Sequence, residues 1–178
     1  MSIHQKLLRI ADAPTVKGIR PMVKKDVKEM RKLLTDFLST KEVVFTYTNQ
    51  EVEHFFMPKA GVMYTYVIED EESKKITDFF SFYSLPSSVL KHERHKSINA
   101  VFSFYNTSLN HTPTQIMENS VIFAKKEGFD VMNCLDILDN NEFLEDCKFR
   151  RGSGSLYYYL YNFALNNKQP NEIGIVLV

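Results

Sequence analysis

Two β-rich runs that follow one another in the chain constrain the fold most strongly. Residues 62–69 and 75–83 are rich in β-branched and aromatic side chains, and the charged segment between them carries Asp70, Glu71, Glu72 and Lys74. Such residues favour extended backbone, and a short polar connection returns the chain antiparallel to itself. The pattern predicts a β-hairpin with a polar turn, ended by Pro86.

Helical periodicity appears on both sides of this hairpin. After Asp26, a candidate N-cap, apolar residues repeat at helical spacing at Val27, Met30, Leu33, Leu34, Phe37 and Leu38. The opposite face is charged and is expected to be solvated; it carries Lys24, Lys28, Glu29, Arg31 and Lys32. Thr48 and Glu51 have the spacing of a capping box, which predicts a short helix through Phe56. A further helix is predicted over residues 113–127, ended by Gly128.

Further extended segments along the chain predict the other strands of a sheet. Strands are predicted at residues 5–10, 41–47, 97–105, 129–135, 156–163 and 172–178, with a short helix from Asn140 or Asn141 to Cys147. The expected class is α/β or α+β, with a mixed, largely antiparallel sheet flanked by helices. A length of 178 residues favours one domain, residues 1–178.

The last predicted strand ends in Gly174-Ile175-Val176-Leu177-Val178. Chain ends are usually polar and frayed unless a sheet or a docking contact holds them. We therefore expect this apolar run to be buried and to carry the Val178 carboxylate into the protein. A carboxylate held at a fixed position is a possible general base.

The composition of the chain argues against several classes of protein. The 22 basic and 22 acidic residues balance, so no global field favours nucleic acid or an anionic membrane. Cys134 and Cys147 are too few for a disulfide framework, and reduced thiols are the simpler interpretation. The sequence has neither a signal-peptide pattern nor an apolar run long enough to cross a bilayer, so a cytoplasmic location is expected.

Three local patterns contain residues that could carry chemistry. His92 and His95 have a metal-ligand spacing, but they lie in a basic loop with no third ligand nearby, so no metal is expected. Cys134 lies in an apolar run, which favours an inert thiol over a nucleophile. The tyrosines around Tyr158 fit core packing or contact with a substrate.

The segment from Arg150 to Leu156 contains two glycines, Gly152 and Gly154, which allow positive φ and close approach to a ligand. Phosphate binding is disfavoured because the spacing is not that of a P-loop and a strand-like run, rather than a helix, follows. Approach to a peptide and a plain β-turn both remain open.

Several of these segments together resemble the C-terminal half of eukaryotic N-myristoyltransferase, and the resemblance runs in order along essentially the whole chain. It lies in residues 18–22, 51–56, 77–87, 102–106, 125–133, 148–154 and 158–162 and in the terminal Gly-Ile-Val-Leu-Val. It implies an acetyltransferase-like fold that builds most of a peptide groove, with the C-terminal carboxylate, here that of Val178, accepting a proton from the glycine ammonium of the substrate. An acyl-CoA half that would bind the co-substrate myristoyl-CoA is expected to be absent from this chain, which is then inactive alone.

The resemblance also assigns residues to the peptide site: Ser87, Phe102, Asn133, Gly152, Ser153, Gly154, Leu156 and Leu177. Arg150 and Ser153 stand where the family usually has glycine and aspartate, which should weaken selection for basic peptides. Phe102 stands where tyrosine is common. Two alternatives remain open: a non-enzymatic protein of this fold that binds peptide N-termini, and a small stand-alone acyltransferase.

Overall fold

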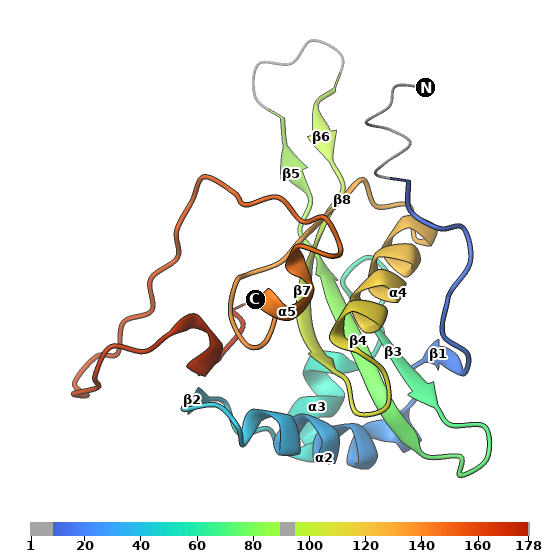
Figure 1. Cartoon of the computed structure of the whole chain (residues 1–178), viewed down its shortest axis with the longest axis horizontal. Helices are drawn as coiled ribbons and strands as arrows, with labels where there is room; N and C mark the ends of the chain where they lie inside the picture. Colours follow the sequence, from blue (N-terminus) through green and yellow to red (C-terminus); the bar gives the residue numbers. More distant parts are fainter. Residues whose placement is uncertain (1–8, 90–94, 178) are drawn as a thin grey trace.

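A five-stranded sheet forms the centre of the protein (Figure 1). The computed structural model describes residues 9–89 and 95–177. The strand order is β1-β3-β4-β7-β8, from β1 (Ile19–Pro21), β3 (Met63–Glu69), β4 (Ile76–Ser84), β7 (Ala100–Thr107) and β8 (Val131–Asn133). The first four strands pair antiparallel, and β8 runs parallel to β7. The prediction of a mixed, largely antiparallel sheet is confirmed.

The predicted hairpin is the β3–β4 pair. Its register places Met63 opposite Tyr83 and Val67 opposite Phe79. In the polar turn, the Asp70 carboxylate accepts hydrogen bonds from the backbone N–H and the hydroxyl of Ser73, each at 2.7 Å. The side-chain bonds within the turn explain why a charged segment closes the hairpin.

Helices cover both faces of the sheet. α2 (Val27–Leu38) and α3 (Asn49–Phe56) contribute buried side chains to one apolar cluster, and α4 (Pro113–Lys126) contributes to another. Successive strand residues alternate between them, since Phe79 lies in the first cluster and Phe80 in the second. The result is a three-layer arrangement with the core on both sides of β4.

The capping box at α3 is confirmed. The Thr48 hydroxyl accepts from the Glu51 backbone N–H at 3.2 Å, and the Glu51 carboxylate accepts from the Thr48 N–H at 2.7 Å.

Asp26 precedes α2 as predicted, but it does not cap that helix through its side chain. Its buried carboxylate instead accepts from the Val23 N–H at 2.8 Å and pairs with the Arg20 guanidinium at 2.6 Å. A single-turn 3₁₀ helix, η1 (Lys24–Asp26), leads into α2 and turns the carboxylate back toward β1.

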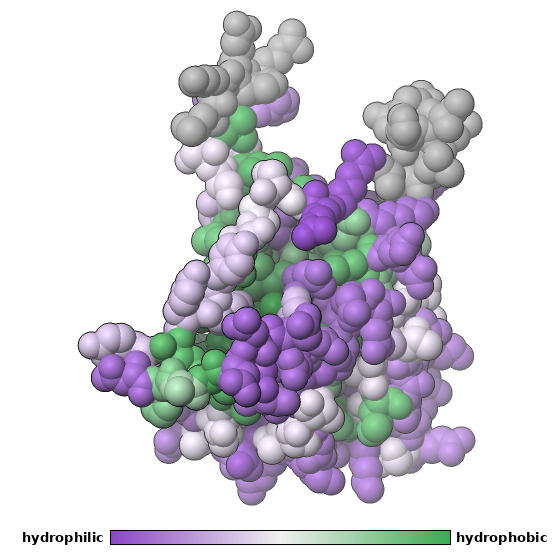
Figure 2. Space-filling view, turned by 60° about the vertical axis from the view of Figure 1, so that its left-hand side comes forward, coloured by the Kyte–Doolittle hydropathy of each residue, from purple (hydrophilic) through white to green (hydrophobic). Residues whose placement is uncertain are grey.

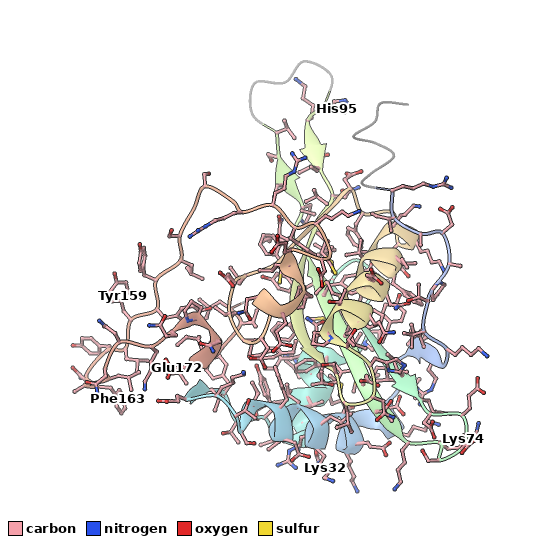
Figure 3. All side chains as sticks on the ribbon, in the orientation of Figure 1. Lys32, Lys74, His95, Tyr159, Phe163 and Glu172 are labelled. Atoms are coloured by element: carbon pink, nitrogen blue, oxygen red, sulfur yellow. The ribbon has the colours of Figure 1, made fainter. Side chains whose placement is uncertain are left out.

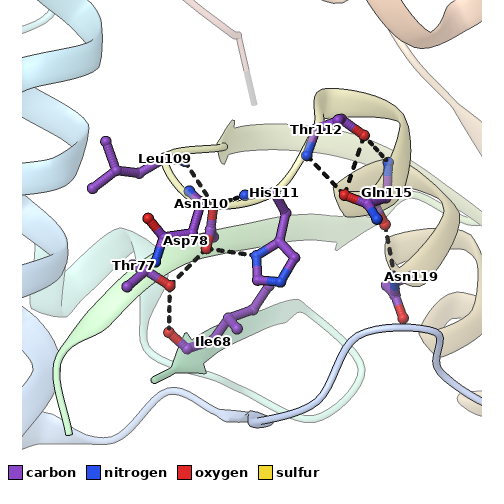
Figure 4. A network of polar contacts seen from close by, with 9 residues as sticks. All are labelled: Ile68, Thr77, Asp78, Leu109, Asn110, His111, Thr112, Gln115 and Asn119. Atoms are coloured by element: carbon purple, nitrogen blue, oxygen red, sulfur yellow. Dashed lines mark hydrogen bonds and ion pairs between the residues drawn. The ribbon is translucent and has the colours of Figure 1, made fainter. Parts of the chain in front are cut away.

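Buried Asp78 organises the connection from β7 to α4 (Figure 4). Its Oδ1 accepts from the backbone N–H groups of Leu109, Asn110 and His111, at 2.6, 3.0 and 3.3 Å. Its Oδ2 accepts from the Thr77 hydroxyl at 2.7 Å and lies 2.9 Å from His111 Nδ1. A carboxylate with this many donors is satisfied despite complete burial, so it fixes the turn before α4.

Several predicted strands are wrong or shorter than predicted. Residues 156–163 form no strand. Within residues 41–47 only β2 (Val43–Val44) is a strand, and within the described residues 172–177 only β9 (Ile173–Gly174) is. These two short strands pair in parallel. β8 covers part of residues 129–135 and is not buried, since Val131 is exposed. Backbone that finds no neighbouring strand cannot form a ladder, whatever its side-chain pattern. Most of residues 5–10 lies outside the described residues.

The other elements are short. β5 (Ser87–Ser88) and β6 (Ser97–Ile98) pair above the ends of β4 and β7 in Figure 1. The predicted helix to Cys147 is α5 (Asn141–Leu144), and a 3₁₀ turn, η2 (Pro170–Glu172), precedes β9. No helix within residues 9–89 and 95–177 has the length and apolarity needed to span a membrane.

Candidate functional site

The segment from Ile173 to Leu177 runs into the body of the protein. Ile173 and Val176 are buried in the cluster that α2 and α3 cover. Gly174 is so close to β2 that a Cβ built on it would lie 2.8 Å from Val44 Cγ1. The expected burial of the chain end is confirmed as far as Val176, and Leu177 is 51 % exposed. Val178, the predicted base, lies outside the described residues.

Tyrosine hydroxyls hold the backbone of this segment. Tyr105, on β7, donates to the Gly174 carbonyl at 3.0 Å and accepts from the Val176 N–H at 3.1 Å. Tyr158 donates to the Ile175 carbonyl at 2.8 Å, and Tyr83, on β4, donates to the Leu177 carbonyl at 3.1 Å. The three tyrosines come from different parts of the chain, and together they bond every residue of the backbone from Gly174 to Leu177.

The protonation state of these hydroxyls suits this role. Burial raises the pKa of Tyr83, of Tyr105 and of Tyr158. All three therefore keep their protons near neutral pH and act as donors to carbonyl oxygens.

Three of the predicted peptide-site residues come together through Tyr83. Phe102 lies opposite Tyr83 on β7 and stacks on its ring, with centroids 5.7 Å apart at 20°. Asn133 lies opposite Phe102 on the other side, in β8. Leu177 is tied to the same place by the hydroxyl of Tyr83. The half-buried face made by Tyr83, Phe102 and Asn133 thus adjoins the last described residue of the chain.

The other predicted peptide-site residues lie elsewhere. Ser87 is exposed in the separate β5–β6 pair, and its hydroxyl donates to the Leu85 carbonyl at 3.4 Å. Gly152, Ser153, Gly154 and Leu156 are exposed in a segment without regular structure. Neither Gly152 nor Gly154 adopts a positive φ.

Comparison with known proteins decides the family. Residues 1–176 match the family described as myristoyl-CoA:protein N-myristoyltransferase, C-terminal domain. The chain belongs to this family. It is 41 % identical over 172 residues to glycylpeptide N-tetradecanoyltransferase 2 of Bos taurus, which covers 97 % of the chain and 34 % of the bovine protein. It is 42 % identical over 178 residues to the glycylpeptide N-tetradecanoyltransferase of Plasmodium falciparum, covering all of the chain and 43 % of that protein.

Solved structures agree with this assignment. Saccharomyces cerevisiae N-myristoyltransferase with bound myristoyl-CoA superposes with a TM-score of 0.77 at 27 % identity, over 84 % of the chain and 39 % of the yeast protein. A ribosomal-protein-alanine N-acetyltransferase from Brucella melitensis has a TM-score of 0.59 at 14 % identity, which shows a shared acetyltransferase-like fold alone. The chain thus spans about two fifths of the length of these N-myristoyltransferase relatives.

The remaining candidates from the sequence are the two cysteines and the pair His92 and His95. Cys134 and Cys147 are free thiols, and burial raises the pKa of each to about 12, which leaves both unreactive at neutral pH. His92 lies outside the described residues. Within the part of the chain that the structure describes, no group of three or more His, Cys, Asp or Glu side chains is arranged to hold a metal.

Sequence reasoning missed Tyr83 and Tyr105 as residues of this site. Both belong to strands predicted as ordinary core, and nothing in their local pattern distinguishes them from neighbouring aromatic residues. Their partners lie 94 and 69 or 71 residues away in the chain, so only the fold reveals them.

Proposed function

We propose that this chain is the peptide-binding domain of a protein N-myristoyltransferase. The complete enzyme would transfer myristate from myristoyl-CoA to the N-terminal glycine of proteins. The observation that carries the proposal is the backbone of the terminal segment, held by tyrosine hydroxyls up to Leu177, in a chain that belongs to this family. The carboxylate of Val178 follows by a single residue.

Transfer of an acyl group to an N-terminal amine requires a general base, and the Val178 carboxylate is the candidate. An N-terminal ammonium has no lone pair and must lose a proton before it attacks a thioester. The Val178 carboxylate would accept the proton. The amine nitrogen then attacks the carbonyl carbon of the acyl group; an N–C bond forms, the C–S bond breaks, and the thiol of CoA leaves.

The peptide would lie along the face made by Tyr83, Phe102 and Asn133. Phe102 offers a ring without a hydroxyl, and Asn133 offers an amide that both donates and accepts. Arg150 and Arg151, both exposed, place positive charge beside the loop, so weak selection for basic peptides is expected.

The acyl donor requires a second domain. The relatives are more than twice as long as the matched region, and the structure of the yeast relative carries myristoyl-CoA. We propose that the unmatched part of such a protein binds myristoyl-CoA and that this chain alone does not transfer the acyl group. The two free thiols suit a reducing compartment, and we propose the cytoplasm.

The exposed segment after Gly154 supplies a docking surface for that domain. Tyr157, Tyr159, Tyr161 and Phe163 are each more than 70 % exposed, and the labelled Tyr159 and Phe163 point away from the body (Figure 3). Figure 2 shows apolar surface in the hollow between this segment and the body. Exposed aromatic side chains in such number are typical of a surface that a partner covers.

Isothermal titration calorimetry tests the proposal. A peptide that begins with glycine should bind the chain, and the same peptide with an acetylated N-terminus should bind at least tenfold more weakly, because it lacks the ammonium that the carboxylate would face. Myristoyl-CoA should show no tight binding. Tight binding of myristoyl-CoA, or equal affinity for the two peptides, would contradict the proposal.

A further inference from the structure

The three tyrosine hydroxyls divide the terminal segment among themselves. Tyr105 takes the Gly174 carbonyl and the Val176 N–H, Tyr158 takes the Ile175 carbonyl, and Tyr83 takes the Leu177 carbonyl. We propose that Tyr83, Tyr105 and Tyr158 are positioning residues, which hold the terminal segment so that its carboxylate can accept the proton. This inference rests on the proposed function for its catalytic consequence, although the holding itself can be measured without it.

The segment needs such side chains because its strand pairing stops early. β9 pairs with β2 only at Ile173 and Gly174. Beyond Gly174 no ladder bond is formed in the described chain, and buried backbone groups without partners are costly. Hydroxyls from β4, from β7 and from the segment around Tyr158 take these groups instead. The backbone from Ile175 to Leu177 is therefore held by side chains, which can be removed one at a time without breaking a strand pair.

Tyr105 is the centre of this arrangement. Its ring is fully buried and packs against Phe56 and Phe104, so it cannot touch a substrate. Its hydroxyl donates to Gly174 and accepts from Val176, and it also accepts from the Tyr47 hydroxyl at 3.3 Å. A hydroxyl has one donor and two acceptor sites, so all three are occupied. Such full use indicates a hydroxyl placed for its bonds rather than for the packing of the ring.

Removal of the Tyr105 hydroxyl tests whether its hydrogen bonds hold the terminal segment. Tyr105→Phe keeps the ring and its packing but leaves the Val176 N–H and the Gly174 carbonyl without their partner. The loss of one buried hydrogen-bond partner raises the population of locally opened states by about tenfold or more. Tyr66→Phe is the matched control, because Tyr66 is also buried and its hydroxyl donates to Glu127 at 2.9 Å, but it lies in the other apolar cluster and, in the described chain, makes no bond to the terminal segment.

The experiment combines two measurements. Carboxypeptidase release of Val178 from the chain, well below its melting temperature, should be about tenfold faster for Tyr105→Phe and unchanged for Tyr66→Phe. In the enzyme completed with an acyl-CoA-binding domain, Tyr105→Phe should lower kcat by about tenfold to a hundredfold with the KM for peptide unchanged, since small displacements of a catalytic group have effects of this size. A variant that merely unfolds more readily would lower the amount of active enzyme without changing the pH dependence of kcat, whereas a misplaced base shifts it.

Equal release of Val178 from Tyr105→Phe and from the unaltered chain would overturn the proposal. So would faster release with an unchanged kcat and pH profile. If the completed enzyme with the unaltered chain does not transfer myristate, the proposed function fails, and the release rates still decide whether the tyrosines hold the terminus.

Discussion

Substitution of Gly174 tests how tightly the terminal segment is packed. A Cβ at this position would lie 2.8 Å from Val44 Cγ1, 3.0 Å from Leu38 Cδ2 and 3.2 Å from Lys41 Cβ. Forcing a methyl group into a filled site costs about 1–3 kcal/mol, and the lower entropy of alanine in the unfolded chain offsets about 0.4–1 kcal/mol. We expect Gly174→Ala to lower the free energy of unfolding by about 1–2 kcal/mol. For a chain of this size this corresponds to a fall in Tm of about 2–8 °C.

Urea denaturation of four variants provides the assay. Val44→Ala removes the nearest atom, so it should recover about 1 kcal/mol when combined with Gly174→Ala, although Val44→Ala alone should be mildly destabilising. Gly152→Ala serves as control, because no atom of another described residue lies within 4 Å of its Cβ position, and it should not destabilise. An unchanged midpoint for Gly174→Ala, or the same effect of Val44→Ala in both backgrounds, would refute the reasoning.

Three further predictions concern other parts of the molecule. Gly18 and Gly61 have nearly the same φ, +75° and +76°, but a Cβ on Gly18 would lie 2.3 Å from the Glu69 carbonyl oxygen and one on Gly61 would meet nothing; Gly18→Ala should therefore cost about 1–3 kcal/mol more than Gly61→Ala in denaturant unfolding. Burial opposes ionisation of Asp26, but hydrogen bonds from Arg20 and the Val23 N–H outweigh it and hold the pKa of the carboxyl below 3.8. The ionised Asp26 carboxylate therefore stabilises the folded state above about pH 3.8, and this stabilisation is lost as the pH falls through the lower pKa of the folded state. Asp26→Asn should lower the free energy of unfolding at pH 7, and urea titrations at each pH should show this difference narrowing below about pH 4. Cys134 and Cys147, whose pKa values burial raises from 9.0 to about 12, should react with iodoacetamide at pH 7.5 at least about tenfold more slowly in the native chain than in urea, since the loss of thiolate outweighs its greater nucleophilicity; comparable rates would contradict their burial.

The sequence predicted those elements whose causes are local. The capping box of Thr48 and Glu51, the periodic face of α2 and the polar turn after Glu69 all involve residues within a few positions of each other, and the structure confirms them. Residues 156–163 show the limit. Their alternation is strand-like, but a strand forms only where another backbone accepts its hydrogen bonds. In the described chain only Tyr158 of this run turns inward, to the Ile175 carbonyl.

In the candidate site, too, the features with a local cause could be predicted from the sequence and those that depend on distant partners could not. An apolar chain end predicted burial of the terminal segment, and the fold agrees as far as Val176. The hydroxyls of Tyr83 and Tyr105 could not be predicted, because their partners are 69 to 94 residues away and one aromatic residue on a strand resembles the next. The Asp78 network is hidden for the same reason, since its loop partners lie more than 30 residues along the chain.

The most direct test of the account moves the terminal carboxylate. One alanine added after Val178 displaces the carboxylate by about 3.8 Å along the chain and leaves every tyrosine bond to residues 174–177 available. In the enzyme completed with an acyl-CoA-binding domain, we expect turnover of a glycine-starting peptide to fall by at least about a hundredfold with little change in KM, whereas Val178→Leu, which keeps the carboxylate in place, should remain active. Unchanged turnover in the extended chain would contradict the claim that the carboxylate of Val178 accepts the proton.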